Sequence, residues 1–302
     1  MKQANVLGAA LVIVGTIATA TPAAAQATIG ADVGLFSDYV WRGITYTNKF
    51  VIQPDAYITF PTGPASFTAG GWFNIEPGKY DGNTDISESG GLSSFDVAEF
   101  DWWGEFNYPH QKANFTLGAT GYYFPNDAGF TKAANTYEIY GKVALSVPLN
   151  PKVAMWYDVD KIKGAYFEGS ISHTIQPKEQ KFSVVLGALA GFNAGQGIPD
   201  DPNSDQSFNF VDNGFTHLDL SAAVPFSAGP LSISPALHVV VTGDDATKFT
   251  EFNHTTGVAN SKDVKVWFGG TISWSRALGA APPEETEEKP AEEKPAEETP
   301  QQ

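Results

Sequence analysis

Polar and aromatic side chains alternate residue by residue along this chain, and this alternation restricts the fold more than any other feature. In the segment 98–108 every acidic residue is odd-numbered, and every aromatic residue except Trp103 is even-numbered. A strand places such residues on two opposite faces, whereas a helix would spread them around its circumference. About twelve segments of roughly ten residues repeat this pattern between Ile29 and Trp274. The sequence therefore predicts an all-β fold.

Two kinds of connection separate these segments in turn. The short turns are rich in Pro, Gly and Asn and lie at 61–64, 109–114, 148–151, 176–180 and 225–230. The longer polar loops lie at 76–97, 125–134, 194–213 and 242–261, with two shorter connections at 45–50 and 161–164 on the same side of the alternation. This arrangement is typical of a transmembrane antiparallel up-and-down β-barrel of the bacterial outer membrane, with about twelve strands and no free edges. A secreted β-sandwich is the alternative, although it would not explain the alternating turns and loops.

The two ends of the chain differ from the predicted barrel. A basic Lys2, an apolar stretch at 6–17 and small residues at 23–27 form the pattern of a secretory signal peptide. We therefore expect a cleaved signal peptide at 1–25 and the barrel at 26–276. The remaining segment, 277–302, is rich in Pro and Glu and is predicted to be a disordered acidic tail. Such a tail either contacts the cell wall or a periplasmic partner, or is a solvated extension.

Composition excludes several classes of protein. The chain has no cysteine, which excludes a disulfide framework, a thiolate metal site and a thiol nucleophile. Its net charge of −16 argues against a nucleic-acid partner. After the first segment it has no apolar run of about 18 residues, which excludes a helical membrane protein. We expect outer-membrane lipid and small hydrophilic solutes as partners, and no cofactor.

If the apolar face of each strand contacts lipid, the other face lines the lumen. The charged residues predicted to line the lumen and set its selectivity are Asp38, Arg42, Asp55, Glu99, Asp101, Glu105, Glu138, Glu168 and Asp219. A surplus of acids inside a low-dielectric wall concentrates cations. The alternative is that these side chains only fill a narrow barrel. Asp38 and Arg42 are four residues apart, so a structural ion pair is our first interpretation of them and contact with a substrate is the second.

Large aromatic side chains fall on the same face of the strands as these charged residues. The tryptophans predicted to face the lumen are Trp72, Trp103, Trp156 and Trp267. Exposed rings in a polar channel can stack on sugars or bases, in the way that aromatic side chains stack on nucleobases. The alternative, which we favour, is that they fill the interior.

The first strand, expected at 33–45, carries the most specific motif. Ser37, Asp38 and Tyr39 are followed by Arg42, Gly43, Ile44 and Thr45. This S-D-Y-x-x-R-G-x-[ST] run resembles the opening of the TorF porin family. The resemblance implies an outer-membrane barrel with a channel function.

Two further patterns suggest chemistry and are weak. Asp201, Asn203 and Asp205 have the spacing that opens a calcium loop, but Gln206 stands where that loop requires Gly. A solvated acidic loop is the default interpretation. A lipid hydrolase would need a serine beside a histidine, and no serine is evidently placed near any of the five histidines. We therefore expect no catalytic residue and no enzyme.

Together these features favour one function. We expect an outer-membrane porin for passive diffusion of small hydrophilic solutes, with a preference for cations. The alternative is a non-conducting structural or interaction barrel that acts through its loops or its periplasmic tail. An outer-membrane lipid hydrolase is the less favoured third interpretation.

Overall fold

A computed structural model describes residues 26–78, 92–125, 135–177, 182–196, 210, 212–243, 251–253, 258–260 and 264–278. The predicted signal peptide, nearly all of the acidic tail and the calcium-like run at 201–205 lie outside these residues. Within the described part of the chain, no helix is long and apolar enough to cross a membrane.

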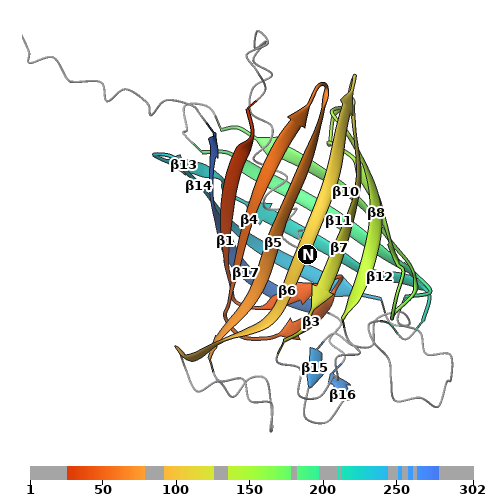
Figure 1. Cartoon of the computed structure of the whole chain (residues 1–302). Coiled ribbons are helices and arrows are strands. Elements are labelled where there is room, and N and C mark those ends of the chain that lie inside the picture. The colour runs from red at the N-terminus through yellow and green to blue at the C-terminus, as the bar shows by residue number, and fades with distance from the viewer. Residues whose placement is uncertain are drawn as a thin grey trace, which may run out of the picture.

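Twelve antiparallel strands form a closed barrel (Figure 1). They are β1 (Thr28–Phe36), β4 (Val51–Thr62), β5 (Ala65–Gly78), β6 (Leu92–His110), β7 (Ala113–Tyr123), β8 (Thr136–Leu145), β9 (Lys152–Asp158), β10 (Gly164–Ile175), β11 (Val184–Ala194), β12 (Gly214–Ala223), β14 (Leu231–Thr242) and β17 (Val264–Ala277). A short strand, β13 (Phe226–Ala228), follows β12 and also pairs with β14.

Closure depends on the pairing of the first strand with the last. β1 pairs with β17 from Thr28 opposite Ala277 to Phe36 opposite Gly269. The ring is completed where β12 pairs with β14. The predicted barrel and its strand number are confirmed, and the sandwich alternative is wrong, because the strands form one ring and not two facing sheets.

Tight turns lie at one end of the barrel (Figure 1). Thr62 faces Ala65 across a two-residue turn at Gly63 and Pro64. Gly63 has a φ of 69°, a conformation that glycine adopts without a steric penalty. At the other end the chain forms the longer connections, as the alternation of turns and loops predicted.

The burial of each strand follows the period of two that the sequence shows. In β9 the side chains of Val153, Met155 and Tyr157 are exposed, whereas those of Ala154 and Trp156 are buried. Large apolar side chains cover the outer surface of the other strands in the same way. Examples are Leu117 on β7, 68% exposed, and Phe268 on β17, 62% exposed. An apolar exterior around a charged interior is the arrangement of a transmembrane β-barrel.

The chain departs from the prediction after β1. The expected first strand at 33–45 is wrong, because β1 ends at Phe36 and residues 37–50 turn into the barrel. We call residues 37–50 the inner hairpin. Its strands are β2 (Tyr39–Trp41) and β3 (Ile44–Thr47). They form a small sheet with β15 (Glu251–Asn253) and β16 (Val258–Asn260) at the loop end (Figure 1).

Backbone conformation and burial explain this departure. Arg42 and Gly43 have φ values of 52° and 83°, which reverse the chain between β2 and β3. A Cβ at Gly43 would lie 2.7 Å from Cβ of His217, so the turn also needs glycine for close packing against the wall. Every residue from Asp38 to Thr45 is buried, whereas a wall strand would expose every second side chain to lipid. The connection expected at 45–50 is part of the same hairpin.

Candidate functional site

The inner hairpin is fastened to the barrel wall at its two ends. At the first end, the Ser37 amide donates to the carbonyl oxygen of Phe268 on β17 at 2.8 Å, and Asp38 forms an ion pair with Lys265, which is also on β17. At the far end of the hairpin, Thr47 Oγ1 donates to Glu76 Oε1 on β5 at 2.5 Å. These contacts hold the hairpin inside the ring of strands.

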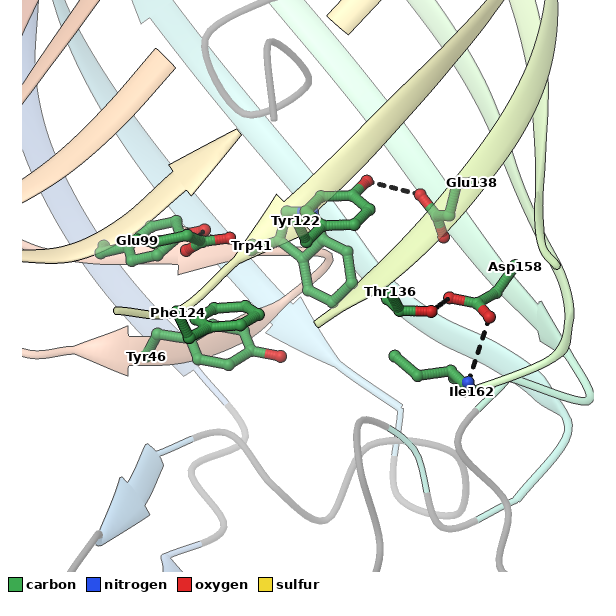
Figure 2. Close-up of a pocket in the computed structure, with 10 residues that line it drawn as sticks. Trp41, Tyr46, Glu99, Tyr122, Phe124, Thr136, Glu138, Asp158 and Ile162 are labelled. Carbon is green, nitrogen blue, oxygen red and sulfur yellow. Dashed lines mark hydrogen bonds between the residues drawn. The ribbon is translucent and has the colours of Figure 1, made fainter. Parts of the chain in front are cut away.

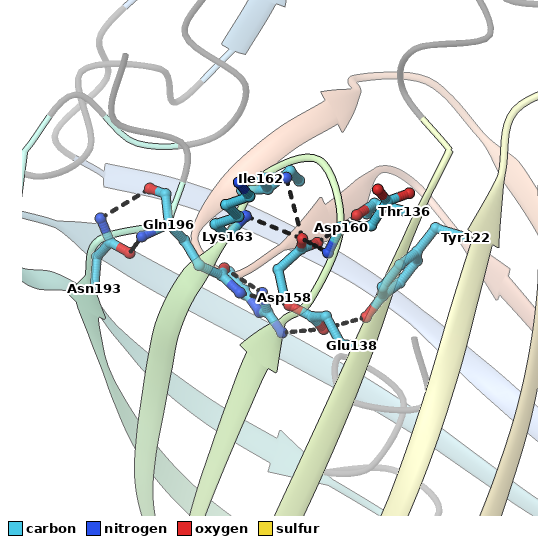
Figure 3. Close-up of polar contacts among 10 residues, drawn as sticks. Tyr122, Thr136, Glu138, Asp158, Asp160, Ile162, Lys163, Asn193 and Gln196 are labelled. Carbon is cyan, nitrogen blue, oxygen red and sulfur yellow. Dashed lines mark hydrogen bonds and ion pairs between the residues drawn. The ribbon is translucent and has the colours of Figure 1, made fainter. Parts of the chain in front are cut away.

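The tip of the hairpin is fixed by Arg42, which is 4% exposed. Its two terminal nitrogens each donate to one oxygen of Glu138 on β8, both at 2.8 Å. Nη1 also donates to Gln196 Oε1 at 2.6 Å, and Gln196 Nε2 donates to Glu138 Oε1 at 2.6 Å. A bidentate arginine–carboxylate pair is strong and directional, and here both partners are buried. In Figure 3, Gln196 and Glu138 lie at the ends of this network, with Tyr122 beyond Glu138.

Aromatic rings surround the Arg42 guanidinium. Its central carbon lies 4.2 Å from the centre of the Trp41 ring and 4.3 Å from that of Tyr166. Burial alone would lower the pKa of Arg42, but the Glu138 carboxylate more than offsets this and raises the pKa above its ordinary value. Arg42 is therefore charged, and the rings and the carboxylate together compensate the charge.

The two ion pairs of the hairpin lie on opposite sides of the barrel. Around the ring, β8 and β17 are six strands apart in a barrel of twelve. Arg42 reaches β8 and Asp38 reaches β17. The inner hairpin therefore spans the lumen near the loop end.

Asp158 has a structural role close to this site. Its Oδ1 accepts hydrogen bonds from the backbone amides of Asp160, Ile162 and Lys163 at 3.0–3.1 Å, and its Oδ2 accepts one from Thr136 Oγ1 at 2.6 Å (Figure 3). This carboxylate closes the tight connection between β9 and β10.

Two of the cavities lined by described residues lie beside the inner hairpin. The first, which we call the mouth cavity, has a volume of about 40 Å³ and is shown in Figure 2. Its walls come from the hairpin and from β6 to β9, and its lining includes Tyr39, Trp41, Tyr46, Glu99, Tyr122 and Phe124. The second, of about 20 Å³, lies against β10 to β17 and includes Glu168, His217 and Asp219. Each has room for only a few water molecules.

The structure places the predicted lumen residues inside the barrel. Eight of the nine charged residues are 8% exposed or less: Asp38, Arg42, Asp55, Glu99, Asp101, Glu138, Glu168 and Asp219. Glu105 is partly buried and accepts a hydrogen bond from Lys142 Nζ at 3.2 Å. The four predicted tryptophans, Trp72, Trp103, Trp156 and Trp267, are 4% exposed or less. Their influence on selectivity stays a prediction.

Asp38 and Arg42 both form structural ion pairs, with other strands and not with each other. Pairing along one strand would have required both residues to lie on the same face of it. The reversal of the chain at Arg42 and Gly43 sends the two side chains to opposite walls instead. Each still forms a structural ion pair, with Lys265 for Asp38 and with Glu138 for Arg42.

Sequence reasoning missed two residues of the site. Gln196 lies just after β11 within a predicted loop, where no periodicity indicates the direction of its side chain. Tyr46 falls in a predicted short connection, whereas in the structure it lines the mouth cavity and packs on Trp41 with ring centres 5.8 Å apart. The available signal for Tyr46 is the alternation that begins with Tyr39 and Trp41. This alternation is equally compatible with a strand of the barrel wall, so it does not indicate the inner hairpin.

These features define a class of protein. A closed ring of antiparallel strands, an apolar exterior and a charged interior make this a β-barrel of the bacterial outer membrane. More narrowly, the chain belongs to the family described as "Bacterial protein of unknown function (Gcw_chp)", whose model matches residues 19–268. The match spans the described barrel up to residue 268, so that residues 269–277 of β17 lie beyond it.

Solved structures of similar architecture have low sequence identity to this chain. An outer membrane channel from Pseudomonas putida F1 is 11% identical, with 87% of this chain and 100% of that chain covered and a TM-score of 0.43. The NanC porin is 8% identical, with 82% and 98% covered and a TM-score of 0.42. LpxR from Salmonella typhimurium is 9% identical, with 82% and 99% covered and a TM-score of 0.42. No curated protein matches this chain.

Proposed function

We propose that this protein is an outer-membrane channel for passive diffusion of small hydrophilic solutes, with a preference for cations. The observation that carries the proposal is the charge of the interior. Eight acids are predicted to line the lumen, against Arg42 and the inward-facing lysines Lys142 and Lys265, which leaves a surplus of five acids. Inside a wall surrounded by lipid, such a surplus lowers the energy of a cation and raises that of an anion. The resemblance of the 37–45 motif to TorF porins supports the same function.

The inner hairpin would set the size limit of this channel. It spans the lumen between β8 and β17, and the cavities beside it have volumes of only about 40 and 20 Å³. Small ions and solutes fit the proposal, and larger solutes would require the hairpin to move.

Single-channel recording tests the proposal. The mature protein is refolded and inserted into a planar bilayer under a KCl gradient, and the reversal potential is read. We expect conductance steps with cation preference. The double variant Asp101→Asn with Glu105→Gln should shift the reversal potential toward zero, because it removes two acids from the lumen face of β6.

The matched control is Asp96→Asn, an exposed acid on the same strand, which should leave the reversal potential unchanged. Equal selectivity in the double variant and the wild type would contradict a role for these two acids.

One observation favours a second candidate function. The mouth is filled by a hairpin that is ion-paired on two opposite walls, which also suits a non-conducting structural barrel. Such a barrel would act through its loops or through contact of its tail with the cell wall or a periplasmic partner. Silence in the bilayer from protein shown to be folded, together with envelope defects on deletion of 279–302, would favour this function over the channel.

A further inference from the structure

We infer that the mouth cavity is a binding site for the primary ammonium group of a small organic cation. The inference deepens the proposed function, on which it rests, by naming the class of cation. The cavity lies at the loop end, where a solute would enter. Its lining combines aromatic rings with a buried carboxylate, which are the two features that recognise an ammonium group (Figure 2).

Rings supply most of the cavity wall. Trp41 is the central ring, with its centre 5.8 Å from that of Tyr46 and 6.3 Å from that of Tyr122. Tyr39 lies 5.5 Å from Tyr46, and Phe124 packs against the same cluster. Figure 2 shows Trp41, Tyr46, Tyr122 and Phe124 grouped around the cavity. These ring pairs are edge-on or tilted, and Arg42 already lies over Trp41, so the inference assigns the cation to the rings of Tyr39, Tyr46, Tyr122 and Phe124.

Glu99 supplies the hydrogen-bond acceptor. It comes from β6, is 3% exposed and lines the cavity. Its Oε2 accepts a hydrogen bond from Tyr39 Oη at 2.8 Å. Its Oε1 is buried and has no hydrogen-bond partner among the described residues. A buried carboxylate oxygen without a donor is an unsatisfied hydrogen-bond acceptor, and an ammonium N–H would donate to it.

The other two acids of the cavity are already engaged. Glu138 is held by Arg42, Gln196 and Tyr122, and Asp158 is held by Thr136 and by backbone amides. Glu99 is therefore the carboxylate that the inference assigns to the ligand.

Hydrogen bonding and wall chemistry narrow the ligand class. A primary ammonium has N–H groups that can donate to Glu99 Oε1, whereas a tetramethylated head has none. Ca²⁺ takes six to eight oxygen ligands, which a wall made mostly of ring carbons does not supply. The geometry thus favours a primary ammonium over a bare metal ion or a bulky quaternary cation.

Calorimetric titration of the refolded protein in detergent, with ethylammonium chloride as the probe, tests the inference. We expect saturable binding in the wild type. Glu99→Gln should weaken it about tenfold or more, the size expected for loss of a charge-assisted hydrogen bond. Phe124→Leu, at the half-buried edge of the cavity, should weaken it about threefold through loss of one ring face. Asp96→Asn is the matched charge control on β6 and should bind as the wild type does.

Competing probes define the class of ligand. Ethanol, a neutral molecule of similar size, should not bind, and tetramethylammonium should bind at least tenfold more weakly than ethylammonium. The inference is overturned if Glu99→Gln binds ethylammonium as tightly as the wild type, if KCl displaces the probe at equal concentration, or if no saturable heat is seen.

Failure of this inference and failure of the proposed function are distinguishable. Titration in detergent needs no conduction, and bilayer recording in KCl needs no amine. Conduction without ethylammonium binding overturns only the binding site. Binding by folded protein that never conducts would keep the site and overturn the channel.

Discussion

At the residue scale, the most consequential interaction is the pair formed by Arg42 and Glu138. Both side chains are buried, so each charge depends on the other for compensation. Lysine could not replace the arginine, because one ammonium cannot donate to both carboxylate oxygens and to Gln196 in the same plane. The sequence identified both residues as charged and inward-facing. It could not identify them as partners, since they are 96 residues apart and only the hairpin brings them together.

Replacing Arg42→Met should lower the free energy of unfolding by about 3–5 kcal/mol, because it leaves the Glu138 carboxylate buried without its counter-ion. Urea unfolding of the refolded protein measures the change. The double variant Arg42→Met with Glu138→Met removes both charges and should recover most of the loss. A double variant as unstable as the single one would show that the ion pair is not the source of the effect.

At the scale of the element, wall strands were predictable and the inner hairpin was not. A wall strand has lipid on one side and the lumen on the other. Its side chains therefore alternate between apolar and polar with a period of two residues. In the inner hairpin, the residues from Asp38 to Thr45 are buried at both parities. Alternation then loses its meaning, and the motif at 37–45 resembles a strand while forming a turn.

Removal of the inner hairpin should widen the channel. Phe36 and Val51 are directly opposite in the β1–β4 pairing, so a short Gly-Asn turn can replace 37–50 without disturbing either strand. We expect single-channel conductance to rise several-fold, because the hairpin no longer spans the lumen. Full recovery of folded protein, judged by its heat-dependent mobility in gels, is the necessary control. Unchanged conductance would mean that the constriction lies elsewhere.

At the scale of the whole molecule, the apolar exterior decides where the protein resides. Exposed Leu, Phe, Val and Ile side chains cover the outer face of the ring, and such a surface is stable only in contact with lipid. This part of the structure was the most predictable from the sequence. Two features of the sequence predict the closed ring, the strand number and the alternation of turns and loops. They are the two-residue alternation of side chains and the spacing of Pro and Gly.

Leu117→Arg, near the middle of β7 on the outer face, should cost about 2–4 kcal/mol of stability in lipid vesicles, because a charge there lies near the bilayer midplane. Leu149→Arg is the control. Leu149 is also exposed but lies in the turn between β8 and β9, where the same change should cost about 0–1 kcal/mol. Equal costs at the two positions would argue against a membrane centred on the middle of the strands.

The hairpin that joins β8 to β17 has a mechanical consequence. A hollow cylinder of strands can flatten when the pressure of the surrounding lipid changes, because its hydrogen bonds run around the circumference and none crosses the interior. Here a rigid crosspiece connects two diametrically opposite points of the wall through ion pairs. Ion pairs to two opposite walls therefore resist flattening of the barrel from within.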